Sequence, residues 1–173
     1  MKKKFACVLF FWLFLLAACS LNQKSNVSET TVDNMEKVDF YLEVVDKLVT
    51  SDEALVYETK NLALDLSNSP LELDDEEMKT LKQNLEEKYN KKILFSDYES
   101  LVKEGMIDDE KGAWNDGALI KIEGKEKLEN NELEFKCELW RSGSGAIYFE
   151  DCNAKWTKDG NLEGIEYGGE AIS

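Results

Sequence analysis

The feature that most constrains the fold is a regular alternation of apolar and charged residues in the last third of the chain. From residue 132 to residue 139 every second side chain is charged, and the side chains between them are apolar: Leu133, Phe135, Cys137 and Leu139. A period of two is typical of a β-strand with one face in the core and the other in solvent. Similar segments at 118–123, 146–156 and 162–167 are separated by turn-like residues. The sequence therefore predicts a four-stranded antiparallel meander.

Helical periodicity dominates the part of the chain that precedes the meander. Residues 33–50 carry an apolar residue every three or four positions, at Met35, Val38, Leu42, Val45 and Val49. A second helix is expected at 75–89, where Asp74 and Glu77 have the spacing of a capping box. A third, shorter helix is expected to begin with a capping box at Ser96 and to end at Gly105.

Two short apolar runs, at residues 62–66 and 93–95, flank the second helix. They predict two strands that would form a βαβ unit with that helix. We therefore expect one α+β domain over residues 32–173. Its C-terminal four-stranded meander is extended by one or two N-terminal strands, and three helices pack on the sheet.

The turn between the second and third strands of the meander sets the expected register. If residues 142–145 (Ser-Gly-Ser-Gly) form a turn centred between Ser144 and Gly145, Cys137 lies opposite Cys152. The neighbouring pairs on that face are then Leu133 with Trp156, Phe135 with Ala154, and Leu139 with Glu150. Opposed residues lie about 5 Å apart at Cβ, so we expect a disulfide between the two cysteines. The alternative is two buried thiols that pack as small hydrophobic groups.

The same register places one charged residue, Glu150, on the inner face. Either a β-bulge turns this side chain outward, which we favour, or Arg141 pairs with it. The opposite face carries Trp140, Ile147 and Phe149. This cluster is either covered by a helix or exposed as a candidate binding patch.

The N-terminal residues have the pattern of a secretory signal. Three lysines precede an uncharged apolar run that is shorter than the about 20 residues a membrane-spanning helix needs. Residues 16–19 (Leu-Ala-Ala-Cys) resemble the lipobox of bacterial lipoproteins. The resemblance implies a signal peptide at 1–18 and a lipid, including palmitate, on Cys19. Residues 19–31 would form a polar tether on the extracytoplasmic face of the cell membrane. A plain signal and an uncleaved anchor are the alternatives.

Charge and composition exclude several classes of function. The chain has 21 Lys and Arg against 36 Asp and Glu, a net charge of −15, which becomes −18 once the signal lysines are removed. This acidity argues against a nucleic-acid partner and against binding flat on an anionic bilayer. It is typical of a solvated surface, or of a docking face for basic partners or cations. The chain has no histidine, so we expect neither a metal nor another cofactor. The oligomeric state is left open.

A second resemblance covers most of the part that follows the signal. It rests on residues 140–146 (Trp-Arg-Ser-Gly-Ser-Gly-Ala), on Asp151 with Cys152, and on 168–173 (Gly-Gly-Glu-Ala-Ile-Ser), and it extends through 61–66. These segments resemble a family of uncharacterised Gram-positive lipoproteins that are sometimes labelled peptide-transport permeases. A permease needs several membrane spans, which this sequence lacks. The resemblance implies a lipoprotein and brings no catalytic residues with it.

Three classes of function follow from these features. We expect a membrane-anchored, non-catalytic binding or accessory module at the cell surface, with a protein or peptide partner. The alternative is a protective or immunity-type lipoprotein that acts against a toxin or an incoming element. A hydrolase built on a pair of carboxylates is the least favoured, because no spacing in the sequence singles out such a pair.

Overall fold

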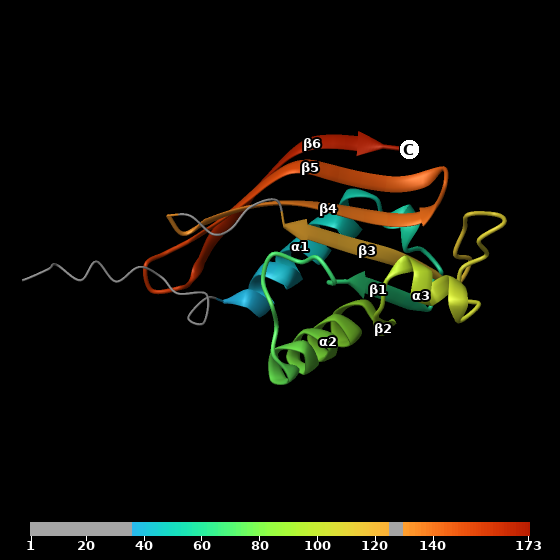
Figure 1. The fold of residues 1–173 in the computed structure, drawn as a ribbon, viewed down its shortest axis with the longest axis horizontal. Coiled ribbons are helices and arrows are strands. Elements are labelled where there is room, and N and C mark those ends of the chain that lie inside the picture. The colour runs from blue at the N-terminus through green and yellow to red at the C-terminus, as the bar shows by residue number, and fades with distance from the viewer. Residues whose placement is uncertain (1–35, 125–129) are drawn as a thin grey trace, which may run out of the picture.

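The computed structural model describes residues 36–124 and 130–173. The predicted signal peptide, the lipidated Cys19 and the tether lie outside the described residues, as do the first residues of the expected helix at 33–50. Within the described residues the chain forms one six-stranded mixed sheet in the order β2-β1-β3-β4-β5-β6, with three α-helices packed on it (Figure 1). The predicted α+β class is confirmed.

The two parallel strand pairs lie at one end of the sheet. Strand β1 (Asn61–Asp65) pairs in parallel with both β2 (Lys92–Phe95) and β3 (Gly117–Gly124). Helix α2 (Asp75–Tyr89) connects β1 to β2, and helix α3 (Tyr98–Lys103) lies on the connection from β2 back across β1 to β3. These two connections cross the sheet in opposite directions. Two connections of the same hand must then place α2 and α3 on opposite faces, as observed.

Local sequence explains where these two helices begin. Asp74 accepts hydrogen bonds from the backbone N–H groups of Glu76 and Glu77, while the Glu77 carboxylate accepts one from the Asp74 N–H. The predicted capping box of α2 is therefore confirmed. For α3 the predicted cap is wrong, because Asp97 rather than Ser96 accepts the hydrogen bond from the Ser100 N–H. An ionised carboxylate is the stronger acceptor for such an N–H group.

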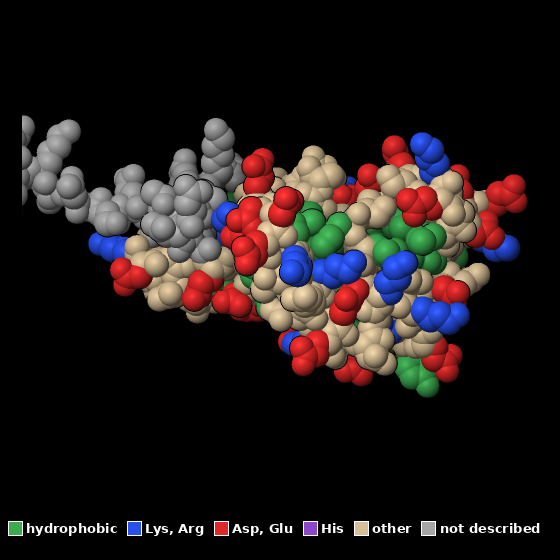
Figure 2. All heavy atoms as spheres, turned by 90° about the horizontal axis from the view of Figure 1, so that it is seen from below, with side chains coloured by type: hydrophobic (Ala, Val, Ile, Leu, Met, Phe, Trp, Pro, Cys, Tyr) green, Lys and Arg blue, Asp and Glu red, His purple; other side chains and the backbone are tan. Residues whose placement is uncertain are grey.

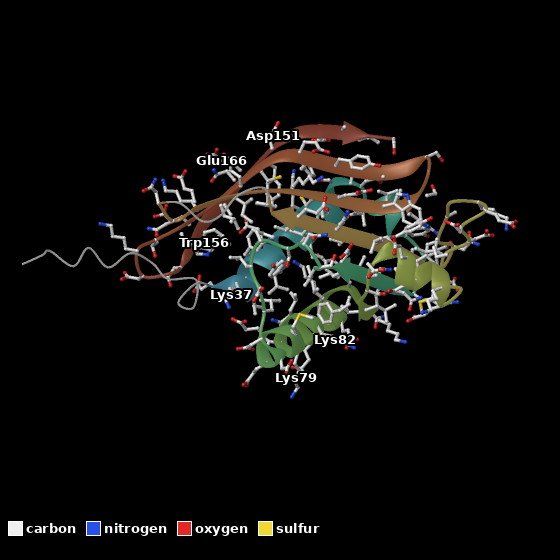
Figure 3. All side chains as sticks on the ribbon, viewed as in Figure 1. Lys37, Lys79, Lys82, Asp151, Trp156 and Glu166 are labelled. Carbon is white, nitrogen blue, oxygen red and sulfur yellow. The ribbon has the colours of Figure 1, made fainter. Side chains whose placement is uncertain are left out.

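The antiparallel meander supplies the rest of the sheet. Strand β4 (Glu132–Ser142) pairs with β3 and with β5 (Gly145–Trp156), and β5 pairs with β6 (Leu162–Ile172). The turn between β5 and β6 lies against the start of helix α1 (Lys37–Ser51). There the Glu36 carboxylate accepts a hydrogen bond from the Leu162 N–H, and Glu36 N–H donates one to the Gly160 carbonyl. Figure 3 shows Trp156 near this end of α1.

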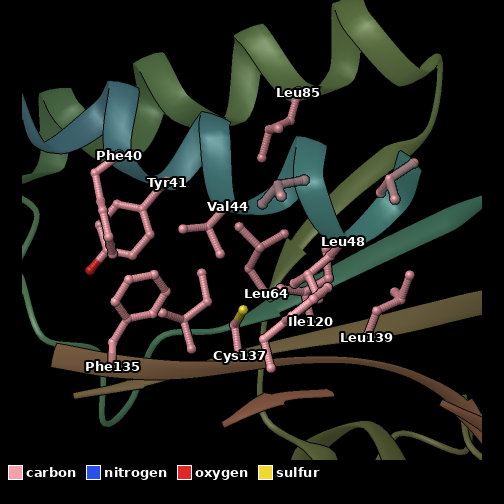
Figure 4. Packing of buried hydrophobic residues seen from close by; sticks show 14 of the residues in the cluster. Phe40, Tyr41, Val44, Leu48, Leu64, Leu85, Ile120, Phe135, Cys137 and Leu139 are labelled. Carbon is pink, nitrogen blue, oxygen red and sulfur yellow. The ribbon is translucent and has the colours of Figure 1, made fainter. Parts of the chain in front are cut away.

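Helices α1 and α2 cover one face of the sheet, which we call the α1 face. Figure 4 shows the side chains of α1 packed between α2 and the strands. The buried side chains of α1 are Phe40, Tyr41, Val44, Val45, Leu48 and Val49. This face is rotated from the predicted stripe, since Val38 and Leu42 lie half-buried at its margin. The aromatic residue Phe40 sets the orientation, with ring centroids 5.0 Å from Phe135 and 5.7 Å from Trp156.

The opposite face, which we call the α3 face, is only partly covered. A smaller apolar cluster beneath α3 contains Leu101, Ile107, Trp114, Ala63 and Leu119. A short 3-10 helix, η2 (Glu53–Leu55), lies at the same end of the sheet as the hairpin turn between β4 and β5.

The outer surface on the side of α2 is seen from below in Figure 2. It carries lysines and carboxylates that alternate with small hydrophobic areas.

The observed register of the β4–β5 hairpin corrects the predicted one. The turn contains only two residues, Gly143 and Ser144, so Ser142 lies opposite Gly145. A register shift at Arg141 then places Cys137 opposite Phe149 instead of Cys152, and a β-bulge at Glu150 and Asp151 shifts the register again so that Phe135 lies opposite Cys152. The predicted bulge is confirmed in this part of β5, where the side chain of Glu150 is exposed.

Glycines let β6 follow the bend that this bulge produces in β5. Gly168 pairs with Asp151, and Gly169 has a φ of +63°, in the left-handed region that glycine tolerates. A Cβ atom at Gly168 would lie 3.0 Å from the Asp151 carbonyl oxygen. The glycine pair and the Asp151–Cys152 pair, which are far apart in the sequence, are therefore parts of one irregular region of the sheet. Figure 3 shows Asp151 on this ribbon.

Candidate functional site

The structure separates the three residues of the predicted binding patch. Ile147 and Phe149 are 0% and 2% exposed on the α1 face, where they pack in the main core. Trp140 lies half-buried on the α3 face. The prediction of one shared patch is therefore wrong, because the extra residue at Arg141 in β4 pairs Ile147 and Phe149 with the inward-facing Leu139 and Cys137.

The two cysteines lie close together in the core but form no disulfide. Cys137 and Cys152 are both buried thiols, which corrects the predicted disulfide. The Cys152 thiol donates a weak hydrogen bond to the Phe149 carbonyl, at 3.6 Å. A hydrogen bond with Cys152, together with burial, raises the pKa of the Cys137 thiol well above its usual range. The Cys137 thiol is thus protonated at neutral pH, as expected of a core residue.

Trp140 is part of a groove on the α3 face, which we call the Trp140 groove. It has a volume of about 400 Å³ and lies between α3, the loop at Gly112 and the hairpin turn at Gly143. The Gly143 N–H donates a hydrogen bond to the Gly112 carbonyl, which closes this end of the groove. The remaining lining residues are Tyr98, Leu119, Lys121, Glu138 and Trp140.

An aromatic pair forms one side of the groove. The rings of Tyr98 and Trp140 meet edge to face, with centroids 5.3 Å apart and planes at 75°. The Tyr98 hydroxyl donates a hydrogen bond to the Asp109 carboxylate at 3.1 Å, which fixes the tyrosine ring. Burial and this hydrogen bond raise the pKa of Tyr98. The pair therefore presents a fixed aromatic surface to any ligand in the groove.

Charged residues from two neighbouring strands form the floor next to the aromatic pair. Lys121 on β3 lies directly opposite Glu138 on β4. However, the Lys121 ammonium pairs with Glu123 at 2.9 Å, and Lys136 pairs with the same carboxylate at 2.8 Å. These two lysines hold the pKa of Glu123 below its usual value.

Glu138 is left without a close cation in this arrangement. Among the described residues, no lysine or arginine nitrogen lies within 4 Å of its carboxylate. Burial raises the pKa of Glu138, and the attraction of Lys121 offsets this only in part. The groove therefore contains a desolvated carboxylate beside an exposed edge of an aromatic pair.

A larger cavity, of about 560 Å³, lies where β1 and β2 end. This is the usual position of a ligand site in open α/β sheets. Several polar groups in and beside it are already bonded within the fold, however. Asp65 accepts hydrogen bonds from the N–H and hydroxyl of Ser67, at 3.0 and 2.6 Å, and Asp97 caps α3. The Tyr41 hydroxyl donates to the Leu71 carbonyl. We therefore place the candidate site at the Trp140 groove.

The hairpin motif around Arg141 has a structural explanation. The guanidinium of Arg141 donates hydrogen bonds to three backbone carbonyls: those of Ala54, Tyr57 and Asn115, at 3.4, 3.2 and 3.1 Å. Its own carbonyl accepts a hydrogen bond from the Trp114 N–H at 2.8 Å. Arg141 thus holds two loops against the hairpin that carries Trp140, and it does not pair with Glu150.

Comparisons with known proteins identify no relative. No protein-family model, no curated protein and no solved structure matches the chain. In the ranges 36–124 and 130–173, no helix is both long enough and apolar enough to cross a membrane. The same ranges contain no cluster of three or more potential metal-ligating side chains.

Sequence reasoning found Trp140 but missed the other residues of the groove. Tyr98 belongs to a separate helix, and only the three-dimensional fold brings it to Trp140. Glu138 reads in the sequence as one of several outward-facing acids on β4. The available signal was that Glu138 and Trp140 are two residues apart on a strand and therefore share a face.

Proposed function

We propose that this protein is a lipid-anchored, non-catalytic binding or accessory module on the extracytoplasmic face of the cell membrane. The anchor is the lipid on Cys19, and the binding surface is the Trp140 groove. The observation that carries the proposal is the groove itself, which is lined by an aromatic pair and a half-buried carboxylate. Binding sites typically combine apolar and aromatic surface with a few polar groups of this kind.

A site-specific photo-crosslinker tests the binding surface. A photoreactive phenylalanine analogue at position 140 should capture a defined partner on intact cells, because this side chain lines the groove. The control position is Lys79, which is exposed on α2 and points away from the sheet (Figure 3). Absence of any adduct at 140, or the same adducts at 79 and 140, would exclude the groove as the binding surface.

A protective or immunity-type role is the second candidate, supported by the net charge of −15. A strongly acidic protein attracts basic targets over long distances. This candidate predicts that cells lacking the protein become sensitive to a basic toxin or to an incoming element. An accessory module predicts the loss of a resident partner's activity instead.

A further inference from the structure

The chemistry of the Trp140 groove indicates what kind of group it binds. We propose that the groove receives the cationic side chain, arginine or lysine, of an extended basic peptide, with its stem on Trp140 and its charge at Glu138. This inference rests on the proposed function, because it assumes that the groove is a binding surface. It adds the chemical class of the ligand.

The geometry suits a long side chain with a charged end. Trp140 and Glu138 lie on the same face of β4, two residues apart, and thus about 7 Å apart along the strand. Leu119 lies opposite Trp140 and extends the apolar floor. Arginine and lysine bury their methylene stems on apolar surface while the charged group stays near polar partners. Cations are also attracted to the faces of tryptophan rings.

The charges in and around the groove favour a cation over an anion. The carboxylates of Glu123 and Glu150 accompany Glu138 on this face, against the ammonium groups of Lys121 and Lys136. Because both lysines pair with Glu123, an incoming cation would give Glu138 the close partner that the described residues do not provide. An incoming anion would meet three carboxylates against two ammonium groups that are already paired. The acidity of the whole chain acts in the same direction by raising the encounter rate with basic segments.

A neutral ligand, such as a sugar that stacks on Trp140, is the main competing occupant. Stacking uses the ring but gives the desolvated carboxylate no counter-charge. The two possibilities differ in their dependence on Glu138, and the experiment uses this difference.

The test is a binding titration of the processed, lipid-anchored protein in detergent, monitored by tryptophan fluorescence. Trp12 lies in the predicted signal peptide and is absent from this form. Trp114 and Trp156 are 2% and 1% exposed, so a ligand in the groove should act mainly on Trp140. The probes are a capped octapeptide of alternating serine and arginine, the same peptide with neutral citrulline in place of arginine, and chitotetraose. The salt concentration is about 150 mM, which screens non-specific attraction between exposed charges.

We expect the arginine peptide to bind at least tenfold more tightly than the citrulline peptide. Glu138→Gln should weaken arginine-peptide binding by about tenfold, because a charge-assisted contact is lost. The matched control is Glu134→Gln, which removes an exposed carboxylate from the same strand and face, and it should change binding by less than about twofold. Trp140→Ala should also weaken binding, which is measured by isothermal titration calorimetry because this variant lacks the fluorescent reporter. If this variant fails to fold by circular dichroism, Tyr98→Leu replaces it.

The outcomes separate the ligand class from the function. Equal binding of the two peptides, or equal effects of Glu138→Gln and Glu134→Gln, overturns the inference of a cationic ligand. If chitotetraose binds in a way that depends on Trp140 but not on Glu138, the cationic ligand is excluded while the groove remains a binding surface. If no probe binds in the titration and the crosslinker at position 140 captures nothing, both proposals fail.

Discussion

At the scale of single residues, the most informative group is the Glu138 carboxylate, because burial makes its ionised form unfavourable in the folded protein. Glu138 is partly desolvated, and its pKa is raised above the ordinary value of 4.5 mainly by burial. In the folded state the charged form of this carboxyl is therefore less favourable than in the unfolded chain. An ionised Glu138 lowers the stability at neutral pH, and this loss disappears as the pH falls below the ordinary value.

Replacing this carboxyl should therefore stabilise the protein. We expect Glu138→Gln to raise Tm at pH 7 by about 1–3 °C relative to the wild type, and this gain should vanish near pH 4, where the wild-type carboxyl is protonated. Thermal unfolding followed by circular dichroism at both pH values measures the difference. Glu134→Gln, which changes an exposed side chain, should leave Tm nearly unchanged. A lower Tm for Glu138→Gln at pH 7 would show that Glu138 has a structural role instead. A residue that weakens the fold but strengthens binding is typical of a functional site.

At the scale of elements, the β4–β5 hairpin shows what the sequence could and could not predict. The alternation in β4 predicts its inner face correctly, because Leu133, Phe135, Cys137 and Leu139 are all buried. The strand partners are harder to predict from the sequence. They depend on the turn length and on bulges, and neither of these changes the local alternation of apolar and charged residues. One extra residue in β4, at Arg141, and one in β5, at Glu150 and Asp151, are enough to turn Ile147 and Phe149 into the core. The candidate patch was therefore wrong at two of its three positions.

The turn length and the register shift at Arg141 also determine the pairing of the cysteines. Because Cys137 lies opposite Phe149, we expect both cysteines to remain as thiols that contribute only packing. Alkylation of the denatured, unreduced protein should modify Cys137 and Cys152 quantitatively, and a reductant should leave Tm unchanged. Mass spectrometry of the peptides that contain these residues measures the first result. Protection of both cysteines from alkylation, together with a Tm that falls on reduction, would show that they are bonded in the protein.

At the scale of the whole molecule, the length of the expected tether limits where the Trp140 groove can act. The N-terminal end of the described part, at Glu36, lies beside the turn between β5 and β6, and the expected tether leads away from there. The twelve tether residues that follow Cys19, 20–31, extend at most about 40 Å. The Trp140 groove would therefore act on partners close to the membrane surface.

Loss of the lipid should release this module. We expect Cys19→Ser to move the protein from the membrane fraction to the soluble fraction, or to leave an uncleaved precursor. Cell fractionation with immunoblotting, and metabolic labelling with a palmitate analogue, measure both results. The matched control is Cys152→Ser, which should keep the label because the labelled position is unchanged. Mature, unlabelled Cys19→Ser protein that still sediments with membranes would show that a lipid on this cysteine is not the anchor.

The packing of α1 has a consequence for the folding rate. Phe40, in the first helix, contacts Phe135 and Trp156, which belong to the β4 and β5 strands far along the chain. Contacts between residues so distant in sequence form slowly, since long segments must be closed before any apolar area is buried. Until β4 and β5 have formed, the apolar face of α1 has only part of the surface it packs on. The slow step of folding is thus expected to be the docking of α1 on the meander, and a chain that reaches this step late would expose its apolar helix to aggregation.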